Sequence, residues 1–155
     1  MKRWLKVTFV TLLFTIPAFL TGHIIWPPAP GTTPSATLLP FFLLLSFLEA
    51  LSFGLGMAFL VYGWPSIRTL AGGSKRMTYT MFVIIAWFLL SWWPHDNLHL
   101  HNGLNLQGLL FIEYGFHVTL MIGGAVLAFC FVRLLRANSR SNVLPGTSSQ
   151  VPTEV

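Results

Sequence analysis

Three histidines lie within one short stretch of the chain, and their spacing could gather imidazole nitrogens around one point. His95 and His99 are four residues apart, and His101 follows two residues later. If the stretch is helical, His95 and His99 lie on one face, and if it is extended, all three imidazoles line one edge. Either geometry presents at least two imidazoles together.

Two further polar groups stand in apolar surroundings. Glu113 and His117 are also four residues apart, so they project from the same face of a helix. They could ligate a metal ion, or they could form a hydrogen-bonded pair that satisfies two buried polar groups. Glu49 has no charged neighbour within a helical turn. A role for its carboxylate in function is therefore the simplest explanation of its presence.

Imidazole and carboxylate without cysteine form the ligand set that suits zinc, non-haem iron, manganese or oxidised copper. The single cysteine, Cys130, excludes an intrachain disulfide and a cysteine-based zinc site. Asp96 and His23 would orient the ligands. The predicted metal ligands are Glu49, His95, His99, His101, Glu113 and His117.

The composition excludes an ordinary soluble domain. Of the 155 residues, 54% are hydrophobic and only 8% are charged, and the mean hydropathy is +0.70, whereas about a quarter of the residues in a soluble domain are charged. Lipid must therefore be the main solvent. Only short loops and a polar tail remain outside the apolar segments, so any activity must lie in or on the membrane helices.

Four apolar segments are long enough to cross a hydrocarbon layer about 30 Å thick. They cover about residues 7–26, 38–62, 77–93 and 108–135. The first lacks a clean small-x-small cleavage site, which favours an uncut anchor over a signal peptide. We expect an all-α, integral membrane four-helix bundle in up-down order over residues 1–136, followed by a disordered cytoplasmic tail over 137–155.

The basic residues predict the orientation of the bundle. With this path, every lysine and arginine falls on one side of the membrane, which should be the cytoplasm. Both termini would then be cytoplasmic, most simply in a plasma or inner membrane, and a histidine-rich loop over 94–107 would be external. The net charge of +5 is thus explained by the cytoplasmic basic residues and does not indicate that the protein binds nucleic acid. The basic residues are Lys2, Arg3, Lys6, Arg68, Lys75, Arg76, Arg133, Arg136 and Arg140.

The histidines and most carboxylates gather in the opposite, outer half. The tendency of basic residues to remain in the cytoplasm does not explain this second asymmetry. At a rise of about 1.5 Å per residue, Glu49 and His117 lie at similar depths, roughly 16 and 14 Å below the outer ends of their helices. A charged carboxylate in lipid costs about 2.5 kcal/mol or more. We therefore expect Glu49, Glu113 and His117 to converge with at least one imidazole of the loop, which would close over them as a lid.

Two functions fit these features. The first is a metal-dependent membrane enzyme or metal-handling protein whose site opens outward. The second is a non-catalytic accessory subunit, held to a membrane-protein partner or a second copy through small-residue faces such as Ala50, Gly54 and Ala58. The sequence leaves open whether the site is catalytic and which metal it binds.

Overall fold

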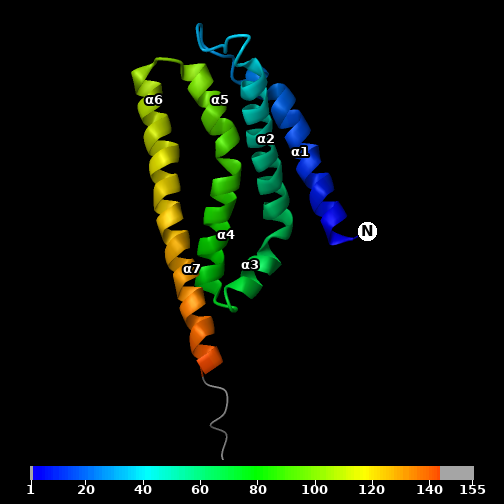
Figure 1. Ribbon diagram of the computed structural model, residues 1–155, viewed down its shortest axis with the longest axis vertical. Helices are drawn as coiled ribbons and strands as arrows, with labels where there is room; N and C mark the ends of the chain where they lie inside the picture. The colour runs from blue at the N-terminus through cyan, green and yellow to red at the C-terminus, as the bar shows by residue number, and fades with distance from the viewer. Residues whose placement is uncertain (1, 144–155) are drawn as a thin grey trace, which may run out of the picture.

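The computed structural model describes residues 2–143, which are helical and contain no strand (Figure 1). The all-α prediction is confirmed. The helices are α1 (Arg3–Ile25), α2 (Leu39–Tyr62), α3 (Trp64–Leu70), α4 (Lys75–Leu90), α5 (Trp92–Asn102), α6 (Leu106–Ile112), the π-helix η1 (Glu113–Val118) and α7 (Thr119–Val143).

Three helical stretches in the described part of the chain are long and apolar enough to cross a membrane. They are α1, α2 and the stretch Leu106–Arg136, which joins α6, η1 and most of α7. The α4 and α5 helices pass the same test together but are bent by 41° at their junction, so they form either a fourth, broken span or a re-entrant loop. The structure thus contains three or four candidate spans, whereas the sequence predicted four.

Pro94 does not end the third span as expected. It lies in the first turn of α5, where a proline removes no intrahelical hydrogen bond. The helix continues past it to Asn102 and stops at Gly103, whose φ of 54° is a left-handed conformation that favours glycine. Most of the expected loop over 94–107 is therefore helix, which was one of its two possible geometries.

The candidate span ends at Arg136, at the expected limit, but the helix that carries it continues further. The α7 helix continues through Val143, seven residues beyond the predicted limit at residue 136. The rest of the predicted disordered tail, residues 144–155, lies outside the described residues.

Glycines on opposite sides of α2 determine its neighbours. A Cβ atom at Gly54 would clash with Thr15 and with the backbone of Thr11 in α1, whereas one at Gly56 would meet Leu89 and Leu90 in α4. Two residues along a helix correspond to a rotation of about 200°. The α1 and α4 helices therefore pack on opposite sides of α2. The expected stripe of Ala50, Gly54 and Ala58 is buried.

The last long helix packs mainly on α4. Gly123 lies against Ile84 and Phe88, and the indole of Trp87 donates a hydrogen bond to Thr119 Oγ1 at 3.0 Å. Successive long helices are thus antiparallel neighbours in the order α1, α2, α4, α7, side by side in one row (Figure 1). The expected antiparallel packing of successive helices is therefore present, because the main contacts join each long helix to the one before and after it.

Candidate metal centre

The helical form of residues 92–102 places two of the predicted ligands together. His95 and His99 share one face of α5, with ring centroids 4.6 Å apart. His95 is buried, only 5% exposed, and its ring lies between Trp92 and Phe116. The apolar surroundings therefore fix the orientation of this imidazole.

The second pair is carried by the π-helix η1. Glu113 and His117 lie in this single wide turn, and His117 Nδ1 donates to Glu113 Oε2 at 2.6 Å. Turns of π-helix inside longer helices are frequent at functional sites. The predicted pairing of Glu113 with His117 is confirmed.

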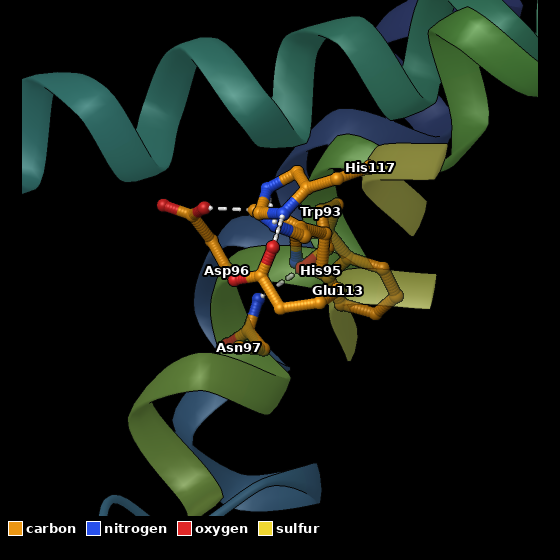
Figure 2. Close-up of polar contacts among 6 residues, drawn as sticks. All are labelled: Trp93, His95, Asp96, Asn97, Glu113 and His117. Atoms are coloured by element: carbon orange, nitrogen blue, oxygen red, sulfur yellow. Dashed lines mark hydrogen bonds and ion pairs between the residues drawn. The ribbon is translucent and has the colours of Figure 1, made fainter. Parts of the chain in front are cut away.

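Three imidazoles converge between α5 and η1. One ring nitrogen from each of His95, His99 and His117 lies within 4.8 Å of the others, so the group could hold a metal ion. The Nε2 atoms of His95 and His117 face each other at 2.9 Å. Figure 2 shows these two rings meeting between the helices, with a carboxylate beside each.

The two carboxylates hold the outer nitrogens of the facing rings. His95 Nδ1 donates to Asp96 Oδ1 at 3.0 Å, as His117 Nδ1 does to Glu113 (Figure 2). A carboxylate that accepts from one imidazole nitrogen fixes the tautomer and directs the lone pair of the other nitrogen toward a metal. The expected orienting role of Asp96 has this geometric basis, and Glu113 holds the same position relative to His117.

The facing Nε2 atoms of His95 and His117 lie at hydrogen-bond distance, so this contact needs one proton between them. The Nδ1 atom of each ring faces its own carboxylate, Asp96 for His95 and Glu113 for His117.

Glu49 lies beside this group, outside the three imidazoles. It is 9% exposed and lines a cavity of about 350 Å³ with Asp96, Ser52 and Trp92. Its carboxyl thus reaches the imidazoles only through Asp96 and His95. The expectation that Glu49 faces protein is correct, but the structure does not bring Glu49 and Glu113 to one point, since they approach the histidines from opposite ends.

The remaining two histidines have other contacts. His101 Nδ1 donates to the carbonyl of Pro27 at 2.8 Å, which ties α5 to the connection between α1 and α2. His23 is exposed and stacks on Phe42, with centroids 5.8 Å apart. Neither residue belongs to the imidazole group, so the predicted ligand role of His101 and orienting role of His23 find no support in their contacts.

Of two residues that the sequence analysis did not single out, Trp93 ties α5 to α1 and Asn97 bonds within α5. Trp93 Nε1 donates to the carbonyl of Ala18 in α1 at 3.1 Å. Asn97 Nδ2 donates to the carbonyl of Trp93 at 2.7 Å (Figure 2). The sequence contained one signal for these two residues, which is that they are four residues apart and flank His95.

A separate cavity gives access to the third imidazole. It has a volume of about 450 Å³ and is lined by His99 and Leu100 of α5 together with residues 30–32 of the connection between α1 and α2. This connection is held by the backbone N–H of Ala29, which donates to the carbonyl of Leu100 at 2.9 Å. The His99 imidazole therefore lines an opening, and the His117 side chain is also partly exposed.

No protein-family model matches this chain, and comparisons with curated proteins and with solved structures find no match either.

Proposed function

We propose that this chain is a multi-pass membrane protein that binds a divalent transition metal, of which zinc is the best fit, through His95, His99 and His117 at the outer side of the membrane. The observation that carries the proposal is the pair of facing Nε2 atoms, whose rings are each held from behind by a carboxylate. Such carboxylate–histidine pairs are typical of protein metal sites.

The distance between two of the three ligands suits zinc after a small adjustment, while the His99 nitrogen, which lies within 4.8 Å of the other two, would move closer to the ion. Four ligands around zinc at about 2.0–2.1 Å lie about 3.3 Å apart in a tetrahedron. The facing nitrogens of His95 and His117, now at 2.9 Å, would need to separate by only about 0.4 Å. The metal would take the place of the shared proton and leave both hydrogen bonds to carboxylates intact.

Three protein ligands leave a fourth position for water or substrate. This arrangement is found in catalytic zinc sites, whereas structural zinc sites have four protein ligands. The cavity beside His99 would supply the access that a reaction or a transfer of metal requires. We therefore favour a metal-dependent membrane enzyme or a metal-handling protein.

The positions of the charged residues support the proposed orientation. Arg3 donates to the carbonyl of Tyr62 at 2.9 Å and to Ser66 Oγ at 3.0 Å, so the basic start of α1 lies beside the end of α2. The imidazole group lies at the opposite end of the helices. With basic residues in the cytoplasm, the metal centre would face outward.

Metal binding by the purified full-length protein tests the proposal. Isothermal titration with Zn²⁺ should show one site in the wild type and at least about tenfold weaker binding in His95→Ala, His99→Ala and His117→Ala, because each loses one of three ligands. His23→Ala and His101→Ala are matched controls that should keep the wild-type affinity. Equal effects of all five substitutions would contradict the assignment.

Two exposed aromatic side chains support the second candidate function, an accessory subunit. Phe111 and Tyr114, on α6 and η1, are each more than half exposed. A membrane partner could pack there. If the chain is such a subunit, the wild type and a variant with His95, His99 and His117 replaced by alanine should be recovered in the same membrane-protein complex. The wild type should then bind no zinc.

A further inference from the structure

A second polar cavity lies far from the imidazoles, between α4 and α7 at the basic end of the molecule. Its volume is about 470 Å³, and its walls combine two arginines, Arg76 and Arg133, with hydroxyl and apolar side chains. Ser74 and Thr80 supply the hydroxyls, while Val126 and Phe129 supply apolar surface. A cavity with this lining could accept a ligand that has both an anionic and an apolar part.

The positive charge in this cavity has no carboxylate partner in the part of the chain that the structure describes. The three carboxylates of residues 2–143 are Glu49, Asp96 and Glu113, and all lie around the imidazole group. The cavity also adjoins the N-terminus of α4, which adds positive potential. An anion is therefore the complementary ligand.

We propose that this cavity binds an anionic phospholipid, with the phosphate between Arg76 and Arg133 and an acyl chain along Val126 and Phe129. Guanidinium groups match phosphate oxygens with two parallel hydrogen bonds. Basic pockets between transmembrane helices on the cytoplasmic side bind anionic head groups. The site requires that α4 and α7 lie in a bilayer and is independent of the metal centre.

The competing explanation is general attraction of anionic lipid to all the basic residues at this end. The chain offers a matched test, because Lys75 and Arg136 lie on the same two helices near Arg76 and Arg133 but do not line the cavity. Arg76→Gln with Arg133→Gln removes the same charge as Lys75→Gln with Arg136→Gln. Only the first pair removes the proposed phosphate ligands.

Native mass spectrometry of the full-length protein in detergent measures the binding directly. Dioctanoyl phosphatidylglycerol should bind one site at least about tenfold more tightly than dioctanoyl phosphatidylcholine, because the choline cation cancels the charge of the head group and repels the two arginines. The Arg76/Arg133 variant should lose this preference, and the Lys75/Arg136 variant should keep it within about twofold. Inorganic phosphate should compete only weakly, because it lacks the acyl chain.

Cys130 provides a second readout without any substitution, since its side chain lines the same cavity. Phosphatidylglycerol should slow its alkylation by a maleimide relative to phosphatidylcholine. Equal losses of binding in the two variants would overturn the proposal. So would competition by inorganic phosphate as strong as that by the lipid, or alkylation of Cys130 at the same rate in both lipids.

Discussion

The backbone of Gly22 in α1 lies against the side chain of Asn97 in α5, so closely that a Cβ atom at residue 22 would come within 2.7 Å of Asn97 Oδ1. Asn97 is buried and bonded to the carbonyl of Trp93, so it cannot swing away freely. Since His95 lies between Trp93 and Asn97, α1 helps to position the imidazole group without contributing a histidine to it.

Gly22→Ala should therefore destabilise the protein by about 1–3 kcal/mol, the usual cost of overpacking a close contact. Thermal unfolding in detergent should show a lower midpoint, and zinc affinity should fall because α5 must shift. Gly115→Ala is the matched control, since a Cβ atom there meets nothing within 4 Å. Equal midpoints for both variants would show that Asn97 yields to the added methyl group.

Glu113→Gln should weaken zinc binding by about 10–100-fold, the usual effect of losing the carboxylate that orients a histidine ligand. The amide keeps the shape of the side chain but no longer presents a charged acceptor to His117 Nδ1. Asp96→Asn should act similarly through His95. Titration calorimetry measures both, and a wild-type affinity in either variant would show that the carboxylate has no orienting role.

Glu49→Gln should leave zinc affinity within about twofold, because its carboxyl lines the cavity beside Asp96 and is not among the converging imidazoles. The glutamine amide can still donate a hydrogen bond to Asp96, so folding should be preserved as well. A loss of zinc affinity as large as that in His95→Ala would make Glu49 a metal ligand, which is the role that the sequence analysis predicted for it.

Zinc binding should weaken as the pH falls from about 8 to 6, because protons compete with the metal for imidazole nitrogens. Binding should release about one proton from the facing pair of His95 and His117, since the metal replaces the proton that they share. Calorimetry in two buffers of different ionisation enthalpy counts this proton. If zinc binding released no proton, the hydrogen bond between the facing rings of His95 and His117 would be contradicted.

The membrane topology can be tested with reporters placed at three sites between the long helices and in the C-terminal tail. Fusions after Lys75 and at the C-terminal tail should read cytoplasmic, and insertions near Gly31 and Gly103 should read external. A cytoplasmic signal at Gly103 would place the imidazole group on the inner side and would reverse the proposed orientation.

Periodicity and hydropathy predicted the helices well, because both are local properties of the sequence. The same holds for Glu113 with His117, whose pairing depends only on a helix. The continuation of the chain as helix through Pro94 was not predictable from the proline alone, since a proline is tolerated in a first turn and the bend at Ser91 provides one.

Interhelical geometry was the part that local patterns could not supply. Glu49 is buried as expected, but the cavity that it lines with Asp96 depends on how α2 and α5 are rotated about their axes. The glycines at 54 and 56 could be recognised as packing residues, yet only the structure shows that they face different helices. A stripe of small residues indicates a close neighbour without indicating which one.

The side-by-side order of the long helices bears on how the protein can be assembled during synthesis. In a closed ring of helices, the first must wait for the last before its second interface is covered. Here α2 can dock on α1, α4 on α2 and α7 on α4 as each leaves the ribosome, because every main partner has already been made. The three imidazoles join α5 to η1, so the imidazole group is completed only when the last long helix has been made.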